Sequence, residues 1–221
     1  MNIEQARFNM IEQQIRPWDV LDQSVLSLLA VVKREDFVPP AHKALAFVDT
    51  EVPLPVSKGV GQCMLAPKVE ARLLQELAVQ KHESVLEIGT GSGYMAALLG
   101  HKAQQVHSLE IDAGLAQTAR TNLRRAGVVN VTVLNVDGAQ GLAAEAPFDV
   151  IVLSGSVAEV PAALLAQLKL GGRLVAIVGQ LPIMQATLFT HSSPDDFSSV
   201  ELFDTVAPRL RGFDEPSRFK F

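Results

Sequence analysis

Cysteine is almost missing from this chain of 221 residues, which has only Cys63. A single thiol excludes an internal disulfide framework and a zinc site built on several cysteines. The histidines are scattered and never show HxxxH spacing, so no metal site is predicted. With no histidine near it in the sequence, Cys63 is interpreted as a small buried residue rather than as an activated nucleophile.

Long apolar runs and basic clusters are missing as well. No stretch of about 18 uncharged apolar residues occurs, and the first residues are polar rather than typical of a signal peptide. We therefore expect a cytoplasmic protein with no membrane partner. The formal net charge is −5 and no run of more than two basic residues occurs, which argues against nucleic acid as a partner.

Hydrophobic residues, in contrast, make up 48% of the chain, which is enough for a sizeable core. From Ser84 onward, short apolar runs alternate with helical patterns, as expected for βαβ units and a parallel sheet. The predicted strands are 84–88, 105–110, 130–135, 148–153 and 172–178, with helices near 94–101, 113–126 and 159–168. Two more strands, near 184–190 and 200–206, are expected to form an antiparallel hairpin at the end of the sheet. The predicted fold is α/β, a Rossmann-like, mostly parallel sheet of seven strands with helices on both faces and an N-terminal helical extension.

The first third of the chain does not show this alternation of strands and helices. Residues 2–15 predict a helix that ends before Pro17, and residues 22–33 predict a second helix with Asp22 as its N-cap. A loop-rich stretch follows, until Pro67 opens a third helix. We therefore divide the chain into an N-terminal segment, 1–80, on the substrate side, and a core, 81–221, that binds the cofactor as one compact unit.

A glycine-rich turn, Glu87-Ile-Gly89-Thr-Gly91-Ser-Gly93-Tyr94, joins the first strand of this core to a helix. Such a turn lets a ligand approach the backbone closely, because no Cβ intervenes. Glu110 ends the next strand, where a carboxylate can accept hydrogen bonds from both ribose hydroxyls. Asp137-Gly138 follows the third strand at the same edge of the sheet, which is where open parallel sheets bind ligands.

The ligand could be a dinucleotide or S-adenosylmethionine. A dinucleotide fingerprint needs a small residue where Tyr94 stands. Glu87 would also lie poorly beside a pyrophosphate, whereas it suits a ligand with an amino group and a sulfonium. The sequence therefore favours S-adenosylmethionine.

The sequence resembles the protein-L-isoaspartate O-methyltransferase family within the class I methyltransferases. The resemblance rests on Glu87–Tyr94, Glu110, Asp137-Gly138, Pro147-Phe148-Asp149 and Gly171–Val175, together with Arg34–Pro39, Pro53-Leu54-Pro55, Gly61-Gln62, Gln167-Leu168 and Val178-Gly179. It implies methylation of isoaspartyl residues in damaged proteins or peptides. It also implies that Glu110 binds the ribose and Asp137 the adenine amino group, while Glu87, Gly89, Thr90, Gly91, Gly93, Ile111 and Gly138 complete the cofactor site.

The chain departs from the family in its substrate loop. The family's Gly-Gln-Thr-Ile-Ser-x-Pro is replaced by Gly61-Gln-Cys-Met-Leu-Ala-Pro67, so Cys63 stands for the threonine and Leu65 for the serine assigned to the active site. The loop before Gly61 is also expected to be slightly longer. After the fourth strand, Ser154-Gly-Ser156 replaces Thr-Ala-Ala. Gln62, Ser154 and Ser156 are the expected substrate contacts, around the catalytic-loop positions Cys63 and Leu65.

Three hypotheses follow from an intact cofactor site beside an altered substrate loop. The first is a methyltransferase that acts on isoaspartyl residues. The second is a methyltransferase of the same fold with another substrate, and the third is a donor-binding protein without turnover. A monomer or weak dimer is expected in each case.

Overall fold

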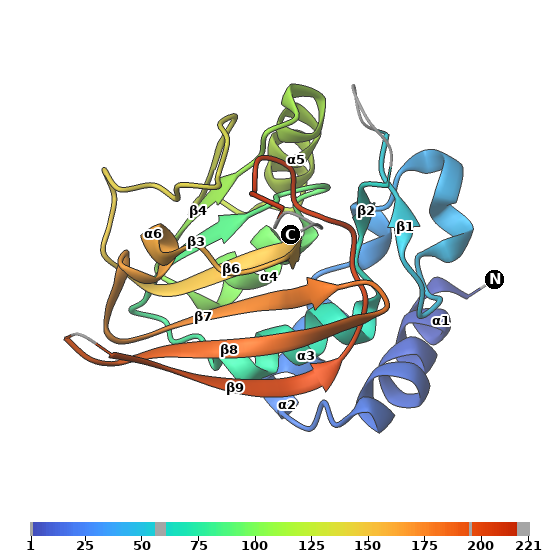
Figure 1. The fold of residues 1–221 in the computed structure, drawn as a ribbon. Helices are drawn as coiled ribbons and strands as arrows, with labels where there is room; N and C mark the ends of the chain where they lie inside the picture. Colours follow the sequence, from blue (N-terminus) through green and yellow to red (C-terminus); the bar gives the residue numbers. More distant parts are fainter. Residues whose placement is uncertain (1, 56–60, 195, 216–221) are drawn as a thin grey trace.

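A seven-stranded sheet forms the centre of the computed structural model, which describes residues 2–55, 61–194 and 196–215 (Figure 1). The strand order is β5-β4-β3-β6-β7-β8-β9. The parallel strands are β3 (Ser84–Ile88), β4 (Gln105–Leu109), β5 (Val131–Leu134), β6 (Phe148–Val157) and β7 (Leu168–Gln180). The last two, β8 (Ile183–Ser193) and β9 (Asp196–Asp204), are antiparallel, so the predicted class and the terminal hairpin are confirmed. Within the described ranges, no helix is long and apolar enough to cross a membrane.

Both faces of the sheet are covered, but unequally. Successive residues of β3, Val85 and Leu86, belong to two separate hydrophobic clusters, one on each face. The first cluster packs under α2 (Gln23–Val31), α3 (Pro67–Leu77), α4 (Tyr94–Lys102) and α5 (Ala113–Arg125), which lie behind the sheet in Figure 1. In the described part of the chain, the other face carries only one short helix, α6 (Ala162–Leu165), together with loops and Leu210 of the C-terminal segment.

The N-terminal segment begins with α1 (Ile3–Met10), which continues as a π-helical turn, Ile11–Ile15. A 3-10 turn, Arg16–Trp18, then carries the chain through Pro17. Asp22 caps α2 by accepting from the Ser24 amide at 2.7 Å, and Pro67 opens α3, as predicted. The loop-rich stretch between them holds two 3-10 turns, Arg34–Asp36 and Pro40–Leu45, and a two-strand ribbon of β1 (Val52–Pro53) and β2 (Cys63–Met64).

The helix predicted near 159–168 is wrong in extent. Pro161 disfavours helical geometry for the residue before it, so α6 begins only at Ala162. Leu168 pairs with Phe148 and is the first residue of β7 rather than the end of a helix. Strand β6 also extends beyond its predicted end to Val157, because Ser156 and Val157 continue to pair with Ile177 and Val178 of β7.

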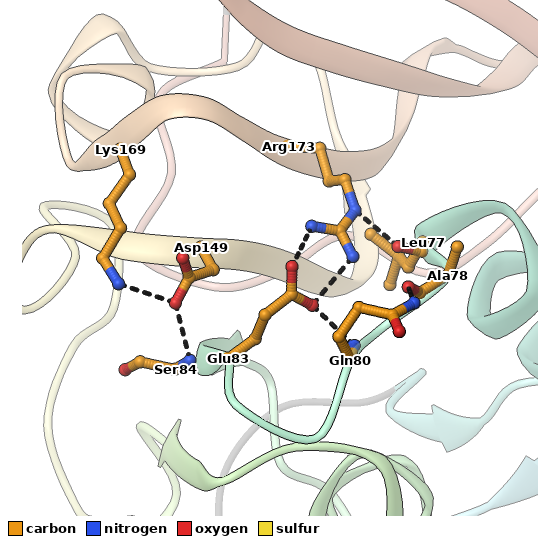
Figure 2. Close-up of polar contacts among 8 residues, drawn as sticks. All are labelled: Leu77, Ala78, Gln80, Glu83, Ser84, Asp149, Lys169 and Arg173. Atoms are coloured by element: carbon orange, nitrogen blue, oxygen red, sulfur yellow. Dashed lines mark hydrogen bonds and ion pairs between the residues drawn. The ribbon is translucent and has the colours of Figure 1, made fainter.

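Arg173 on β7 fixes the C-terminal end of α3 to the amino edge of the sheet (Figure 2). Its two terminal nitrogens donate to Glu83 at 2.7 and 2.9 Å, and its Nε donates to the carbonyl of Leu77. Burial raises the pKa of Glu83, but hydrogen bonds from Arg173 and from the Gln80 amide outweigh it, and the pKa lies below its ordinary value. The contact joins the last turn of α3 to the strand that leads into the glycine-rich turn.

Replacement of Arg173 by methionine should lower the free energy of unfolding by about 2–4 kcal/mol, because Glu83 would lose its partner in a largely buried place. Since the folded pKa of Glu83 is depressed, this stabilisation is present above the ordinary glutamate pKa and is lost as the pH falls through the folded value. Urea denaturation at pH 7 and at pH 3 measures both effects. Lys169→Met removes a more exposed ion pair to Asp149 and should cost about 1 kcal/mol or less. Equal losses for the two variants would contradict the assignment.

Candidate functional site

The glycine-rich turn after β3 requires glycine for two reasons. Gly89, Gly91 and Gly93 have φ of +94°, +55° and +87°, in the left-handed region that favours glycine. A Cβ on Gly89 would also lie 2.6 Å from a methyl carbon of Leu210, and one on Gly93 would lie 3.3 Å from Ala119. The turn therefore exposes backbone, rather than side chains, at the carboxyl edge of the sheet.

Two cavities adjoin this turn, with volumes of about 40 and 20 Å³. Of the predicted site residues, the larger cavity is lined by Gln62, Cys63, Gly89, Gly91, Glu110, Ile111, Gly138 and Ser154. The smaller one is lined by Cys63, Leu65, Glu87, Gly89, Thr90, Gly91 and Ser154. The fold thus brings the predicted cofactor residues and the altered substrate loop to one place.

The remaining predicted residues, Gly93, Asp137 and Ser156, line neither cavity. Gly93 caps α4. Asp137 is exposed, and its carboxylate accepts from the Ala139 amide at 2.9 Å. Ser156 is fully buried and donates to the carbonyl of Ala207 at 2.7 Å, so it holds the C-terminal segment rather than facing a cavity.

Glu110 is held by the backbone and is only 5% exposed. Its Oε2 accepts from the Gly91 amide at 2.8 Å and its Oε1 from the Asp112 amide at 2.9 Å. Each carboxylate oxygen can accept a further hydrogen bond, and the residue lines the larger cavity. Two hydroxyl groups of a ligand could therefore be bound without moving the carboxylate.

Glu87 lies at the end of β3 with no exposure to solvent. Ser108 and Ser154 donate to its two carboxylate oxygens at 2.5 and 2.9 Å. Burial raises its pKa to about 8, and the negative charges of Glu110 and Glu70 act in the same direction, against the two hydrogen bonds. A cation bound beside Glu87 would favour the ionised form.

The loop that is predicted to contact the substrate contains β2, and Leu65 directly follows that strand. Cys63 is half-buried and pairs with Pro53 of β1. Burial and the neighbouring Glu51 raise the pKa of its thiol, so it is not an activated nucleophile. Leu65 is 5% exposed and packs in the first hydrophobic cluster, while its carbonyl accepts from Arg34 at 3.0 Å. The insertion expected before Gly61 falls on residues 56–60, outside the described ranges.

The C-terminal segment 207–212 was missed by the sequence analysis, although it forms part of the larger cavity. Leu210 and Arg211 line that cavity, and Arg211 lies 3.5 Å from the carboxylate of Asp112. Gln62 donates to the carbonyl of Arg209 at 3.3 Å, across 147 residues of sequence. The segment has no periodic pattern, so only the tertiary structure reveals its place.

Comparison with protein families agrees with this geometry. Residues 5–204 match the family described as Protein-L-isoaspartate(D-aspartate) O-methyltransferase. A protein-L-isoaspartate O-methyltransferase of Koribacter versatilis is 42% identical over 81% of this chain and 79% of its own length. Another from Methanoculleus marisnigri is 44% identical over 78% of this chain and 77% of its own.

Two solved structures have the same fold. One, a protein-L-isoaspartate O-methyltransferase, has a TM-score of 0.75 and 26% identity, and the match covers 91% of this chain and 65% of that one. The other, from Plasmodium falciparum and in complex with S-adenosyl-L-homocysteine, has a TM-score of 0.74 over 93% of this chain and 98% of its own. At 21% identity, the second likeness concerns the fold alone.

The raised pKa of Glu87 should make the ligand-free protein less stable as the pH rises. Between pH 4.5, the ordinary pKa, and pH 8, Glu87 is protonated in the folded protein and ionised in the unfolded chain. In this range the free energy of unfolding therefore falls by up to about 1.4 kcal/mol per pH unit. Glu70, with a pKa of about 7, contributes in the same direction only up to that pH. Between pH 7 and 8, Glu87→Gln should therefore abolish most of the decline measured by urea denaturation. Glu159→Gln, at an exposed position, should leave the decline in unfolding free energy between pH 7 and 8 unchanged. If Glu87→Gln shows the same decline as the wild type, Glu87 does not hold a buried proton.

Proposed function

The chain belongs to the protein-L-isoaspartate O-methyltransferase family and is an S-adenosylmethionine-dependent methyltransferase, and we propose that its acceptor is the carboxylate of isoaspartyl residues in proteins and peptides. One observation supports the proposal above others. The cavities at the glycine-rich turn are lined both by Glu87 and Glu110 and by the loop, Gln62–Leu65, that corresponds to the family's substrate loop.

The residues at the turn suit S-adenosylmethionine. Glu110 keeps acceptor capacity for the ribose hydroxyls, and the buried Glu87 suits the positive end of the donor. The glycines provide a cradle that a Cβ on Gly89 would obstruct. The exposed Asp137 is proposed to bind the adenine amino group. When bound, the donor supplies an electrophilic methyl group on a sulfonium.

The acceptor side then needs alignment more than acid–base chemistry. A carboxylate is already ionised at neutral pH, so no side chain has to remove a proton. Cys63, with its raised pKa, is not suited to that task. We propose that Gln62 and Ser154, which line the larger cavity, orient the acceptor, since correct alignment can provide much of the rate of an in-line transfer. The cytoplasmic location and the monomeric or weakly dimeric state stay predictions.

Replacement of Glu110 should weaken donor binding without preventing folding. A hydrogen bond to a charged group contributes about 1.5–3 kcal/mol, so the loss of two should weaken binding of S-adenosylhomocysteine about a hundredfold or more in Glu110→Ala. Glu110→Gln keeps the shape and one acceptor and should fall between that variant and the wild type. Isothermal calorimetry measures both, with the exposed Glu201→Ala on β9 as the control. Unchanged affinity in Glu110→Ala would remove the ribose assignment.

The acceptor is tested by transfer of a radiolabelled methyl group to an isoaspartyl peptide, with the matched aspartyl peptide as the control. We expect slow transfer to the isoaspartyl peptide only, because Leu65 offers no hydrogen bond where the family has serine. Donor binding without transfer to either peptide would favour another substrate or a protein without turnover.

Leu65→Ser should raise isoaspartyl kcat/KM about tenfold, since a restored hydrogen bond contributes about 1–3 kcal/mol. Because Leu65 is buried, the same change should lower the free energy of unfolding by about 2 kcal/mol or more. Leu65→Ala is the matched control, because it loses the same packing and gains no hydroxyl. Adding Cys63→Thr to Leu65→Ser should raise activity further. Equal turnover in the serine and alanine variants would show that position 65 does not limit the reaction.

A further inference from the structure

Helix α3 is held at each end by an arginine that contacts a glutamate and a backbone carbonyl. At the C-terminal end these are Arg173, Glu83 and the carbonyl of Leu77. At the N-terminal end, Arg34 donates to Glu70 at 2.9 Å and to the carbonyl of Leu65 at 3.0 Å. The first contact lies at the amino edge of the sheet, and the second lies in the wall of the smaller cavity.

The contact made by Arg34 is the more deeply buried of the two. The side chains of Arg34 and Glu70 are 0% and 5% exposed, whereas those of Arg173 and Glu83 are 17% and 9% exposed. Removing two charges from water is costly, and their attraction only partly offsets that cost. A merely stabilising contact could be made by apolar side chains, so the position of the pair calls for another explanation.

That position lies between the two halves of the site. The guanidinium of Arg34 lies 5.5 Å from the ring centre of Tyr94, the first residue of α4 after the glycine-rich turn. On its other side, Arg34 fixes the peptide group of Leu65 in the substrate loop. Glu70, Leu65 and Tyr94 all line the smaller cavity, together with Glu87. A change in the pair would therefore shift the loop relative to the donor turn.

We propose that Arg34 and Glu70 are positioning residues for the acceptor side of the site. Glu70 orients the guanidinium, and the guanidinium fixes the carbonyl of Leu65 and with it the backbone of Gln62–Leu65. This inference rests on the proposed function for its kinetic consequence, although the ordering of the loop can be measured without any substrate.

The test replaces the whole ion pair by apolar side chains, Arg34→Met with Glu70→Leu. Such a replacement is often neutral for stability, whereas loss of one partner alone is destabilising. The matched control is Arg173→Met with Glu83→Leu, which removes the same chemistry at the other end of α3. Cys63, the single cysteine, lies two residues before Leu65 and reports loop order through its rate of alkylation by iodoacetamide. Because Glu70 and Arg34 also act on the pKa of this thiol, each variant's rate is compared per thiolate, after its own Cys63 pKa has been measured.

For Arg34→Met with Glu70→Leu, we expect Cys63 alkylation at least fivefold faster than in the wild type. The KM for the isoaspartyl peptide should rise about tenfold, while the Kd for S-adenosylhomocysteine stays within twofold. In the control, Arg173→Met with Glu83→Leu, the rate of Cys63 alkylation and the KM for the isoaspartyl peptide should match those of the wild type. Glu70→Gln, which still accepts from Arg34, should retain most of the acceptor affinity.

Arg34→Lys covers the case in which the double variant does not fold. A lysine can keep a contact with Glu70 but lacks the guanidinium fork that reaches two acceptors, so it should also speed the alkylation of Cys63. Wild-type alkylation and peptide KM in either variant would overturn the proposal. If the wild type itself fails to methylate the isoaspartyl peptide, the proposed function fails, and the alkylation rates still decide whether the pair orders the loop.

Discussion

Keeping carboxyl groups in a dry interior is the constraint on which this site depends. Glu70, Glu87 and Glu110 are each exposed by 5% or less beside one glycine-rich turn. The chain stabilises each of them by a different means. Glu110 accepts from two backbone amides, Glu87 accepts from two serine hydroxyls and has a raised pKa, and Glu70 is paired with an arginine that has no exposure at all. Such an arrangement persists only when the surrounding backbone is rigid, because an unpaired charge in the same place would be strongly destabilising.

These carboxylates also determine what the site can bind. Glu70 and Glu110 both raise the pKa of Glu87, so the region already carries more negative charge than it can readily keep. A pyrophosphate would add charge of the same sign, whereas a ligand with an amino group and a sulfonium would reduce it. The preference for S-adenosylmethionine over a dinucleotide therefore has two independent grounds: the residue type at Tyr94 and the electrostatics of the folded site.

The parts of this structure that sequence patterns can predict are those that local periodicity determines. The strand ends that carry Glu87 and Glu110 could be predicted because buried parallel strands appear in the sequence as apolar runs. The residues that follow such strands lie together at the carboxyl edge of the sheet. The contact between Arg34 and Glu70 could not be predicted from the sequence. It joins a 3-10 turn to a helix, between residues that are 36 positions apart. The segment around Leu210 has no periodic pattern, and α6 was overestimated because the pairing of Leu168 with Phe148 prevails over local helix preference. Ser156 was expected at the substrate, but its hydroxyl is engaged by the carbonyl of Ala207.

The same comparison suggests how the altered substrate loop can coexist with an intact donor site. On the proposed donor side, the candidate binding groups are carboxylate side chains whose positions are fixed by strands and, for Glu110, by two backbone amides. On the acceptor side, leucine at position 65 removes the polar side chain. Leu65 packs in the hydrophobic cluster at the wall of the smaller cavity, and Arg34 fixes its carbonyl. A loop without a hydroxyl can orient an acceptor only through its backbone, through the side-chain amide of Gln62 and through neighbours such as Ser154. Since backbone groups are useful only while their direction is fixed, the buried charge pair behind Leu65 matters more in this chain than it would in one that keeps the serine.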